Sequence, residues 1–189
     1  MKVTREEAAR NHERIIDVAA RLFRERGFEG IGVADLMKEA GLTHGGFYGH
    51  FTSKEELEAE ACTRALTQSL AAWRKRSEAA QDEPLSAITD VYLSPQHRDD
   101  PGAGCLLAAL GSDVSRRGPG VRHAVTGYLD SAFDLLAKLV PAKSKAAMRR
   151  KAIDTYARLI GALVMARAVD DDTLSREILD AVREAVPSG

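Results

Sequence analysis

The stretch AGLTHGGFYGHFTSKEELEAEA, residues 40–61, places four glycines and three aromatic residues directly before a strongly amphipathic segment. A glycine inside a helix costs roughly 1 kcal/mol relative to alanine. Gly45, Gly46 and Gly49 therefore predict a place where another molecule comes close to the backbone. Ser53 and Glu56 have the spacing of a capping box, which predicts that a long helix begins there.

A short helix is also expected before this stretch, over residues 33–40, and Thr43 can cap the helix that follows. Two short helices joined by a glycine-containing turn form the helix-turn-helix pattern, whose second helix enters the major groove of DNA. Phe47 and Phe51 are four residues apart and are expected in the core. Tyr48 then points elsewhere and offers a hydroxyl that suits a phosphate oxygen.

The rest of the chain continues the helical pattern. Apolar residues recur at helical spacing almost throughout, and no alternating run of β-branched residues stands out. We expect helices over residues 53–79, from residue 84, and over about 105–114, 121–139, 144–168 and 172–186, with a loop over residues 94–104. The sequence thus predicts an all-α fold of about nine helices. We expect a helix-turn-helix DNA-binding domain over residues 1–54 and a second helical domain over residues 55–189, with the fourth helix linking them.

Composition narrows the class of protein. The chain has 189 residues, a net charge of −1 and two cysteines, which are too few for a disulfide framework. It has no apolar run near the roughly 20 residues of a membrane span and no signal-peptide pattern at its charged N-terminus. We therefore expect a soluble, cytoplasmic protein without a membrane partner.

Sequence motifs of catalysis and metal binding are also missing. The sequence contains no GxSxG, HExxH or P-loop pattern. His97, His123 and Cys105 lack the spacing of zinc ligands. An acidic run at Asp170–Asp172 is expected to begin the last helix and not to bind metal. We expect neither an enzyme nor a cofactor.

Residues 15–61 resemble the DNA-binding domain of the tetracycline-repressor (TetR) family of transcriptional regulators. The matching signature is AARLFRERGFEGIGVADLMKEAGLTHGGFYGHFTSKEEL, residues 19–57. It contains, in order, Gly-Phe after the first helix, the Ala-Gly turn, Phe-Tyr-x-His-Phe and Ser-Lys-Glu. The resemblance covers about a quarter of the chain.

The resemblance implies which residues meet DNA. It places His44, Gly45 and Gly46 at the bases, and Thr43, Tyr48, His50 and Lys54 at the phosphates. Two positions depart from the family pattern, because Gly32 replaces the usual Ser or Thr and Ala34 replaces a frequent basic residue. The second helix therefore offers fewer contacts. An arm before residue 14, with Lys2, Arg5 and Arg10, can compensate in the adjacent groove.

The resemblance also implies that the second domain binds a small molecule and dimerises. Apolar and aromatic residues of its helices are the candidates for the pocket: Trp73, Tyr92, Cys105, Leu106, Tyr128, Phe133, Tyr156 and Met165. The last two helices are the candidates for the dimer interface, through Ile160, Gly161, Leu163, Val164 and Ile178. The expected partners are a palindromic operator in double-stranded DNA, a small-molecule effector and a second copy of the chain.

Two alternatives remain open at the level of sequence. Cys105 is either a small buried residue or a thiol that senses oxidants or electrophiles, in which case Arg98, Arg116 and Arg117 could favour its thiolate. The chain as a whole is expected to be a repressor that its ligand releases from DNA. The alternative is a helical carrier of small molecules with weak or lost DNA binding, which Gly32 and Ala34 favour.

Overall fold

The computed structural model of the chain describes residues 4–186, and every regular element in that range is a helix. The expected all-α fold is confirmed. Ten helices are described where about nine were expected. In chain order they are α1 (Arg5–Arg26), α2 (Val33–Glu39), η1 (His44–Gly49), α3 (Lys54–Ala79), α4 (Pro84–Tyr92), α5 (Pro95–Asp99), α6 (Leu106–Val114), α7 (Pro119–Ala137), α8 (Lys145–Ala168) and α9 (Asp172–Ala185).

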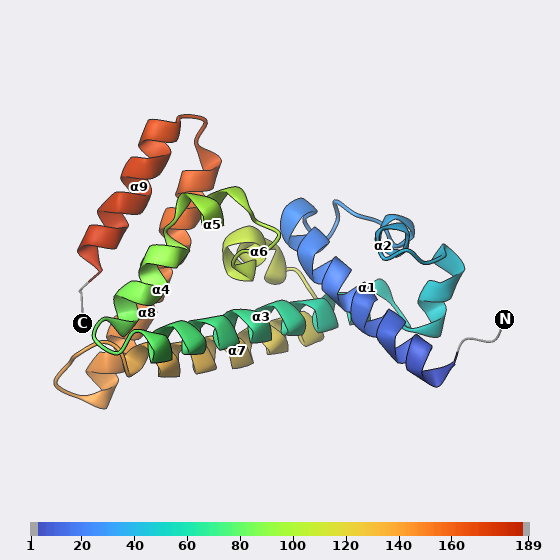
Figure 1. Cartoon of the computed structure of the whole chain (residues 1–189), viewed down its shortest axis with the longest axis horizontal. Helices are drawn as coiled ribbons and strands as arrows, with labels where there is room; N and C mark the ends of the chain where they lie inside the picture. Colours follow the sequence, from blue (N-terminus) through green and yellow to red (C-terminus); the bar gives the residue numbers. More distant parts are fainter. Residues whose placement is uncertain (1–3, 187–189) are drawn as a thin grey trace.

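The helices α1, α2 and η1 form an N-terminal unit, residues 4–52, at one end of the elongated molecule (Figure 1). Thr4 caps α1 by accepting a hydrogen bond from the Glu7 backbone N–H. Gly27 ends α1 with a φ of 79°, and its N–H donates to the Phe23 carbonyl. Gly41, with a φ of 68°, makes the turn that follows α2. Both glycines adopt a left-handed backbone that other residues disfavour.

The third helix differs in type from the expectation. Residues His44–Gly49 form a 3₁₀ helix, not an α-helix. Three of its six residues are glycines, which are poor α-helix formers. Short helical stretches of this kind commonly adopt the tighter 3₁₀ form. The change of type leaves the helix-turn-helix arrangement of α2 and η1 intact, because the two still pack against each other.

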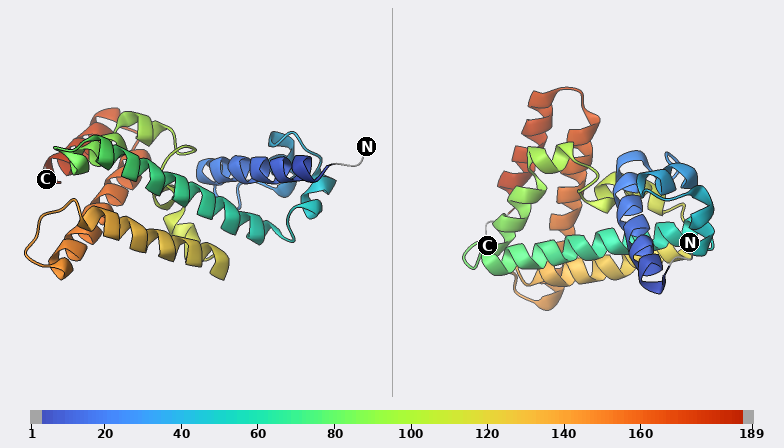
Figure 2. Two further views of the ribbon diagram at one scale, coloured as in Figure 1. Left: turned by 60° about the horizontal axis from the view of Figure 1, so that its bottom comes forward. Right: turned by 45° about the vertical axis from the view of Figure 1, so that its right-hand side comes forward.

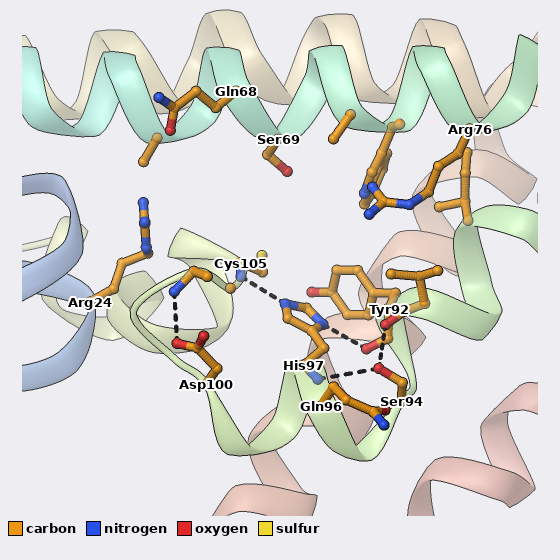
Figure 3. A pocket seen from close by; sticks show the side chains of 17 residues that line it. Arg24, Gln68, Ser69, Arg76, Tyr92, Ser94, Gln96, His97, Asp100 and Cys105 are labelled. Atoms are coloured by element: carbon orange, nitrogen blue, oxygen red, sulfur yellow. Dashed lines mark hydrogen bonds between the residues drawn. The ribbon is translucent and has the colours of Figure 1, made fainter. Parts of the chain in front are cut away.

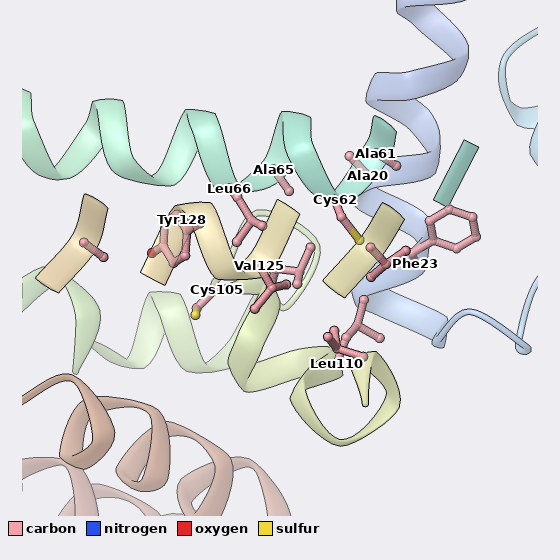
Figure 4. Close-up of a cluster of buried hydrophobic side chains, with 14 of the residues drawn as sticks. Ala20, Phe23, Ala61, Cys62, Ala65, Leu66, Cys105, Leu110, Val125 and Tyr128 are labelled. Carbon is pink, nitrogen blue, oxygen red and sulfur yellow. The ribbon is translucent and has the colours of Figure 1, made fainter. Parts of the chain in front are cut away.

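The remaining helices, α3 to α9, form a C-terminal bundle (Figures 1 and 2). Helices α3 and α7 lie side by side along most of their lengths, and α8 packs against both α7 and α9. The near end of α3 also packs on α1, so this helix joins the two parts of the molecule. The apolar core continues from one part into the other through Phe23, Cys62, Leu66 and Leu110 (Figure 4).

One expected loop is wrong in part. Residues 94–104 contain the short helix α5, which begins at Pro95. The Ser94 hydroxyl caps it by accepting from the His97 backbone N–H, and proline suits the first position of a helix. The expected acidic start of α9 is confirmed, since the Asp171 carboxylate accepts from the Leu174 N–H.

Between residues 4 and 186, no helix combines the length and the apolar character needed to cross a membrane.

Candidate DNA interface and ligand cavity

The outer face of η1 carries the residues expected to read DNA. Tyr48 is 71% exposed, the largest exposure among the large apolar and aromatic side chains of the described residues, and Thr43, His44 and Gly45 are also exposed. Behind them, Phe47 is 1% exposed. The helix therefore has one face in the core and one free face with hydroxyl, imidazole and bare backbone groups.

The glycines of this face are not required by packing within the chain. A Cβ atom added at Gly45 or Gly49 would meet nothing within 4 Å, and one added at Gly46 would make only ordinary contacts. None of the three has a positive φ. A side chain would therefore fit at each of these positions in the isolated chain. The absence of side chains here favours close approach by a second molecule.

His50 and Lys54 lie less openly than expected. His50 is half-buried, and burial together with nearby His12 lowers the pKa of its imidazole. The Lys54 ammonium points inward and donates to the Phe28 carbonyl, 4.0 Å from the Glu58 carboxylate. This differs from the outward position that a phosphate contact needs. A role of Lys54 at phosphate stays a prediction, and it requires the side chain to leave this site.

Lys54 belongs to a polar joint between the N-terminal unit and the C-terminal bundle. Glu58 is only 3% exposed, and burial raises the pKa of its carboxyl group. Arg117, which precedes α7, lies 3.6 Å from this carboxylate and donates to Glu29, which follows α1, at 2.6 Å. Two cations thus compensate one buried carboxylate where the two parts meet.

The starts of α2 and α1 hold the remaining residues considered for DNA contact. Gly32 precedes α2 and makes no side-chain cap, and Ala34 is exposed. Arg5 and Arg10 belong to α1, so the expected arm does not extend through them. The Thr4 cap starts α1 at Arg5, so these residues are helical where an extended arm was expected. Lys2 lies outside the described residues.

A cavity of about 410 Å³ lies between α3 and the α4–α5 segment (Figure 3). Its size is within the range of small-molecule sites. Of the pocket residues expected from the sequence, only Trp73, Tyr92 and Cys105 line it. The other residues of the wall are Arg24, Ala65, Gln68, Ser69, Ala72, Arg76, Ile88, Val91, Ser94, Gln96, His97, Asp100, Ala103 and Gly104.

The other expected pocket residues lie elsewhere. Tyr156 is 1% exposed and packs edge-on against Trp73 and Tyr92, so it supports the wall from behind. Leu106 and Tyr128 are buried, and Phe133 is half-buried in the core. Met165 is 51% exposed on the outer side of α8. These placements correct the expectation, because helical spacing shows which residues share a face but not which face borders a void.

Polar groups in the cavity wall are organised around His97. Its Nδ1 donates to the Tyr92 carbonyl at 2.7 Å, and its Nε2 accepts from the Cys105 backbone N–H at 2.9 Å. This pattern uses the neutral ring, and burial lowers the pKa of the imidazole. The Tyr92 hydroxyl is buried and has no hydrogen-bond partner among residues 4–186.

Comparison with known proteins identifies the N-terminal unit. Residues 15–61 match the family described as "Bacterial regulatory proteins, tetR family". The chain is 31% identical to the uncharacterized HTH-type transcriptional regulator YerO of Bacillus subtilis over 87 residues. The matched segment covers 46% of this chain and 30% of that protein. Over 57 residues it is 39% identical to the HTH-type transcriptional regulator AcrR of Shigella flexneri, covering 30% of this chain and 26% of that protein. Residues 15–61 are thus similar to the DNA-binding domain of this family.

Solved structures resemble the chain over most of its length in fold. The crystal structure of the reduced form of Escherichia coli NemR superposes with a TM-score of 0.78 at 22% sequence identity, covering 93% of this chain and 95% of that one. At that identity the likeness concerns the fold. The matched segments span 30%, 43% and 26% of the length of three curated relatives, so the chain covers less than half of each of them.

The expected dimer surface lies on α8 and α9. Val164 is 42% exposed, and Ile160, Gly161 and Ile178 are half-buried. Leu174 on α9 is 44% exposed and adds to this apolar surface. Leu163, in contrast, is fully buried within the chain. Leu163 therefore belongs to the core, which corrects its assignment to an interface between copies.

The arginines expected near Cys105 are engaged elsewhere. Arg98 pairs with Asp99 and Asp172, Arg116 pairs with Asp113, and Arg117 belongs to the polar joint. The Cys105 sulfur lies 3.6 Å from the Tyr156 hydroxyl and is 5% exposed. Cys62 is also buried, which raises the pKa of its thiol to about 12.

No group of three or more histidine, cysteine or acidic side chains with the geometry of a metal site is found between residues 4 and 186.

Proposed function

We propose that the chain is a transcriptional regulator, a homodimeric repressor that a small molecule releases from a palindromic DNA operator. The observation that carries this proposal is the free face of η1. Its glycines have open space around them and its Tyr48 is 71% exposed, in a unit that matches a family of regulatory proteins. A closed apolar core holds the other side of the helix in place.

The proposed division of labour follows the two parts of the chain. Residues 1–54 read DNA, with Thr43, Tyr48 and His50 at phosphates and His44 at a base edge. Residues 55–189 hold the ligand and form the dimer, with α3 as the link. Two reading units related by a two-fold axis would occupy half-sites one helical turn apart. Such a regulator acts where chromosomal DNA lies, which is the bacterial cytoplasm.

The proposed mechanism is a shift of population. A ligand favours the dimer whose two reading units no longer match the spacing of the half-sites. The cavity of about 410 Å³ lies against α1 and α3, the two helices that orient the reading unit. A ligand in the cavity could therefore change the orientation of the N-terminal unit through direct contact with these helices.

The direct test is binding to operator DNA selected from a random pool, measured over a range of salt concentrations. Tyr48→Phe removes a hydroxyl without touching the core and should weaken all sequences about equally, by roughly three- to tenfold. Lys54→Ala should flatten the slope of log affinity against log salt by about 1 if the side chain reaches phosphate. An unchanged slope would mean that Lys54 stays at the Phe28 carbonyl and does not contact phosphate.

The alternative function is a helical carrier of small molecules without DNA binding. The bare start of α2, at Gly32 and Ala34, favours it. Failure of the chain to retain any duplex at low salt, together with tight binding of a small molecule, would establish the carrier. Salt-dependent, sequence-selective binding would establish the regulator.

A further inference from the structure

The ligand cavity carries excess positive charge over an apolar lining. The charged residues of its wall are Arg24 from α1, Arg76 from α3 and Asp100 from the loop after α5. Asp100 already accepts a hydrogen bond from the Ala103 backbone N–H. His97 contributes no charge in its neutral form. Two guanidinium groups therefore face one occupied carboxylate, beside the aromatic surface of Trp73.

The Arg24 guanidinium is held by a neutral acceptor. Its Nε donates at 2.7 Å to the Gly102 carbonyl, and its Nη2 donates to the same oxygen. Burial lowers the pKa of this guanidinium, so its positive charge is disfavoured where it stands. A carbonyl is a neutral acceptor, whereas an anion would form stronger, charge-assisted hydrogen bonds.

The Arg24–Gly102 contact is also a joint between the two parts of the molecule. Arg24 belongs to the N-terminal unit, and Gly102 belongs to the loop that closes the cavity. Gly102 is packed so closely on α1 that an added Cβ would lie 3.0 Å from Glu25 Cγ and 3.1 Å from Arg21 Cγ. A group that engages Arg24 from the cavity therefore acts on α1 directly.

A second feature points to a bound molecule. The Tyr92 hydroxyl is buried without a hydrogen-bond partner among residues 4–186. Figure 3 shows it turned toward Cys105, among the residues that line the cavity. Leaving a polar group unpaired costs free energy. A ligand could pair with this hydroxyl only if the side chain turned from Cys105 toward the cavity.

We propose that the cavity selects an anionic, largely aromatic small molecule, whose charged group pairs with Arg24 and withdraws it from the Gly102 carbonyl. The loss of that contact frees the C-terminal end of α1 from the loop after α5. The first part of this proposal concerns binding alone. Its second part, the effect on DNA, rests on the function proposed above.

Two fluorescent dyes of nearly the same shape test the binding. One is anilinonaphthalene sulfonate, and the other is phenylnaphthylamine, the same ring system without the sulfonate. Trp73 is the single tryptophan of the chain and lines the cavity, so energy transfer from it is strongest for a dye bound at this site. The anionic dye should bind about tenfold more tightly than the neutral one, as expected for one charge-assisted contact.

Arg24→Gln should remove this preference and leave the affinity for the neutral dye unchanged. Arg21→Gln is the matched control, because Arg21 lies one turn earlier on α1 and pairs with Glu25. It should leave both affinities unchanged. Equal binding of the two dyes, or no transfer from Trp73 with either, would overturn the proposed selectivity. A preference abolished by Arg76→Gln and kept by Arg24→Gln would overturn the position of the anion.

Hydrogen exchange tests the Arg24–Gly102 contact and needs no DNA. The anionic dye should speed hydrogen exchange of the last turn of α1 in the native chain but not in Arg24→Gln. It should also weaken operator binding about tenfold, a usual scale for coupling between sites. Dye selectivity without a change in α1 exchange would overturn the joint. A chain that shows dye selectivity and faster exchange of α1 but binds no DNA would refute the proposed function and leave this inference standing.

Discussion

The N-terminal unit and the C-terminal bundle use aromatic side chains in opposite ways. In the N-terminal unit, Phe23, Phe28, Phe47 and Phe51 are at most 2% exposed, and they form a core without polar side-chain atoms of their own. In the bundle, every aromatic residue except Phe133 carries a hydroxyl or indole group. Two of them, Trp73 and Tyr92, border the cavity, and the Tyr92 hydroxyl has no partner in the described part of the chain.

The difference fits the function proposed for each part. A closed core of phenyl rings fixes the angle between α1, α2 and η1, so the reading face can be presented without rearrangement. A cavity lined by rings with polar tips leaves contacts unmade, and these contacts are available to a ligand. Rigidity in the one part and an incomplete core in the other are both needed if a small molecule is to control DNA binding.

Loss of a ring from the closed core should have the largest effect. Phe47→Ala is expected to lower the free energy of unfolding by about 3–5 kcal/mol, because the removed ring leaves a void that its neighbours cannot fill. Phe133→Ala in the bundle, where the ring is half-buried, should cost clearly less. Urea denaturation of the two variants measures both. Equal costs would remove the distinction between the two cores.

A side chain on the reading face should separate stability from function. Gly45→Leu is expected to weaken operator binding at least 100-fold, about 2.7 kcal/mol, because the added bulk holds the backbone away from the bases. The melting temperature should stay the same or rise slightly, since leucine is the better helix former and the space is free. Gel shift and calorimetry on one preparation suffice, and normal DNA binding would show that the glycine has another role.

The exposed surfaces of the two parts differ in the same sense as their cores. Tyr48 exposes a polar hydroxyl, whereas Val164, Met165 and Leu174 expose only apolar groups. Val164→Glu should weaken the dimer about tenfold or more, on the scale of one apolar side chain, and DNA binding should fall in parallel. Sedimentation of this variant beside Thr126→Glu, an exposed residue of α7, measures the effect. A native chain that is monomeric at micromolar concentration would refute the assignment.

Two buried tyrosine hydroxyls of the bundle allow a test with two signs. Tyr92→Phe removes a buried hydroxyl without a partner and should raise the free energy of unfolding by up to about 1 kcal/mol. Tyr128→Phe removes a hydroxyl that lies 2.9 Å from that of Tyr156 and should lower it by about the same amount. Destabilisation by both changes would mean that the Tyr92 hydroxyl is satisfied in solution.

The smallest expected effect concerns pH. Burial lowers the pKa of His97 below its ordinary value of 6.5, so the folded chain favours the neutral ring. This contribution to stability is complete above pH 6.5 and is lost as the pH falls through the lower, folded-state pKa. Protonation at Nε2 would also break the hydrogen bond from the Cys105 N–H.

His50 in the N-terminal unit provides the comparison for this test. The pKa of its imidazole is lowered as well, but its ring is closer to the surface. His97→Gln should flatten the loss of stability between pH 6.5 and pH 5 more than His50→Gln does, as measured by thermal unfolding across pH. An equal or larger effect of His50→Gln would contradict the importance of the hydrogen bonds made by His97.

Local sequence determined the helices and the reading unit. The caps at Ser53 and Asp171, the turn at Gly41 and the burial of Phe47 and Phe51 depend on residues a few positions apart. Such interactions are written directly into spacing and residue type, so they could be predicted. The missed helix α5 is also local, and Ser94 before Pro95 was the signal that could have revealed it.

The cavity was decided by tertiary structure alone. Its wall joins Arg24 of α1 to Arg76 of α3 and to His97 and Asp100 of the segment after α4. No spacing rule relates these positions, because they meet only when the loop at Gly102 closes on α1. The inward position of Lys54 and the burial of Leu163 have the same origin. An apolar stripe shows that a helix face will be covered, but whether core, cavity or a second chain covers it depends on how the helices pack.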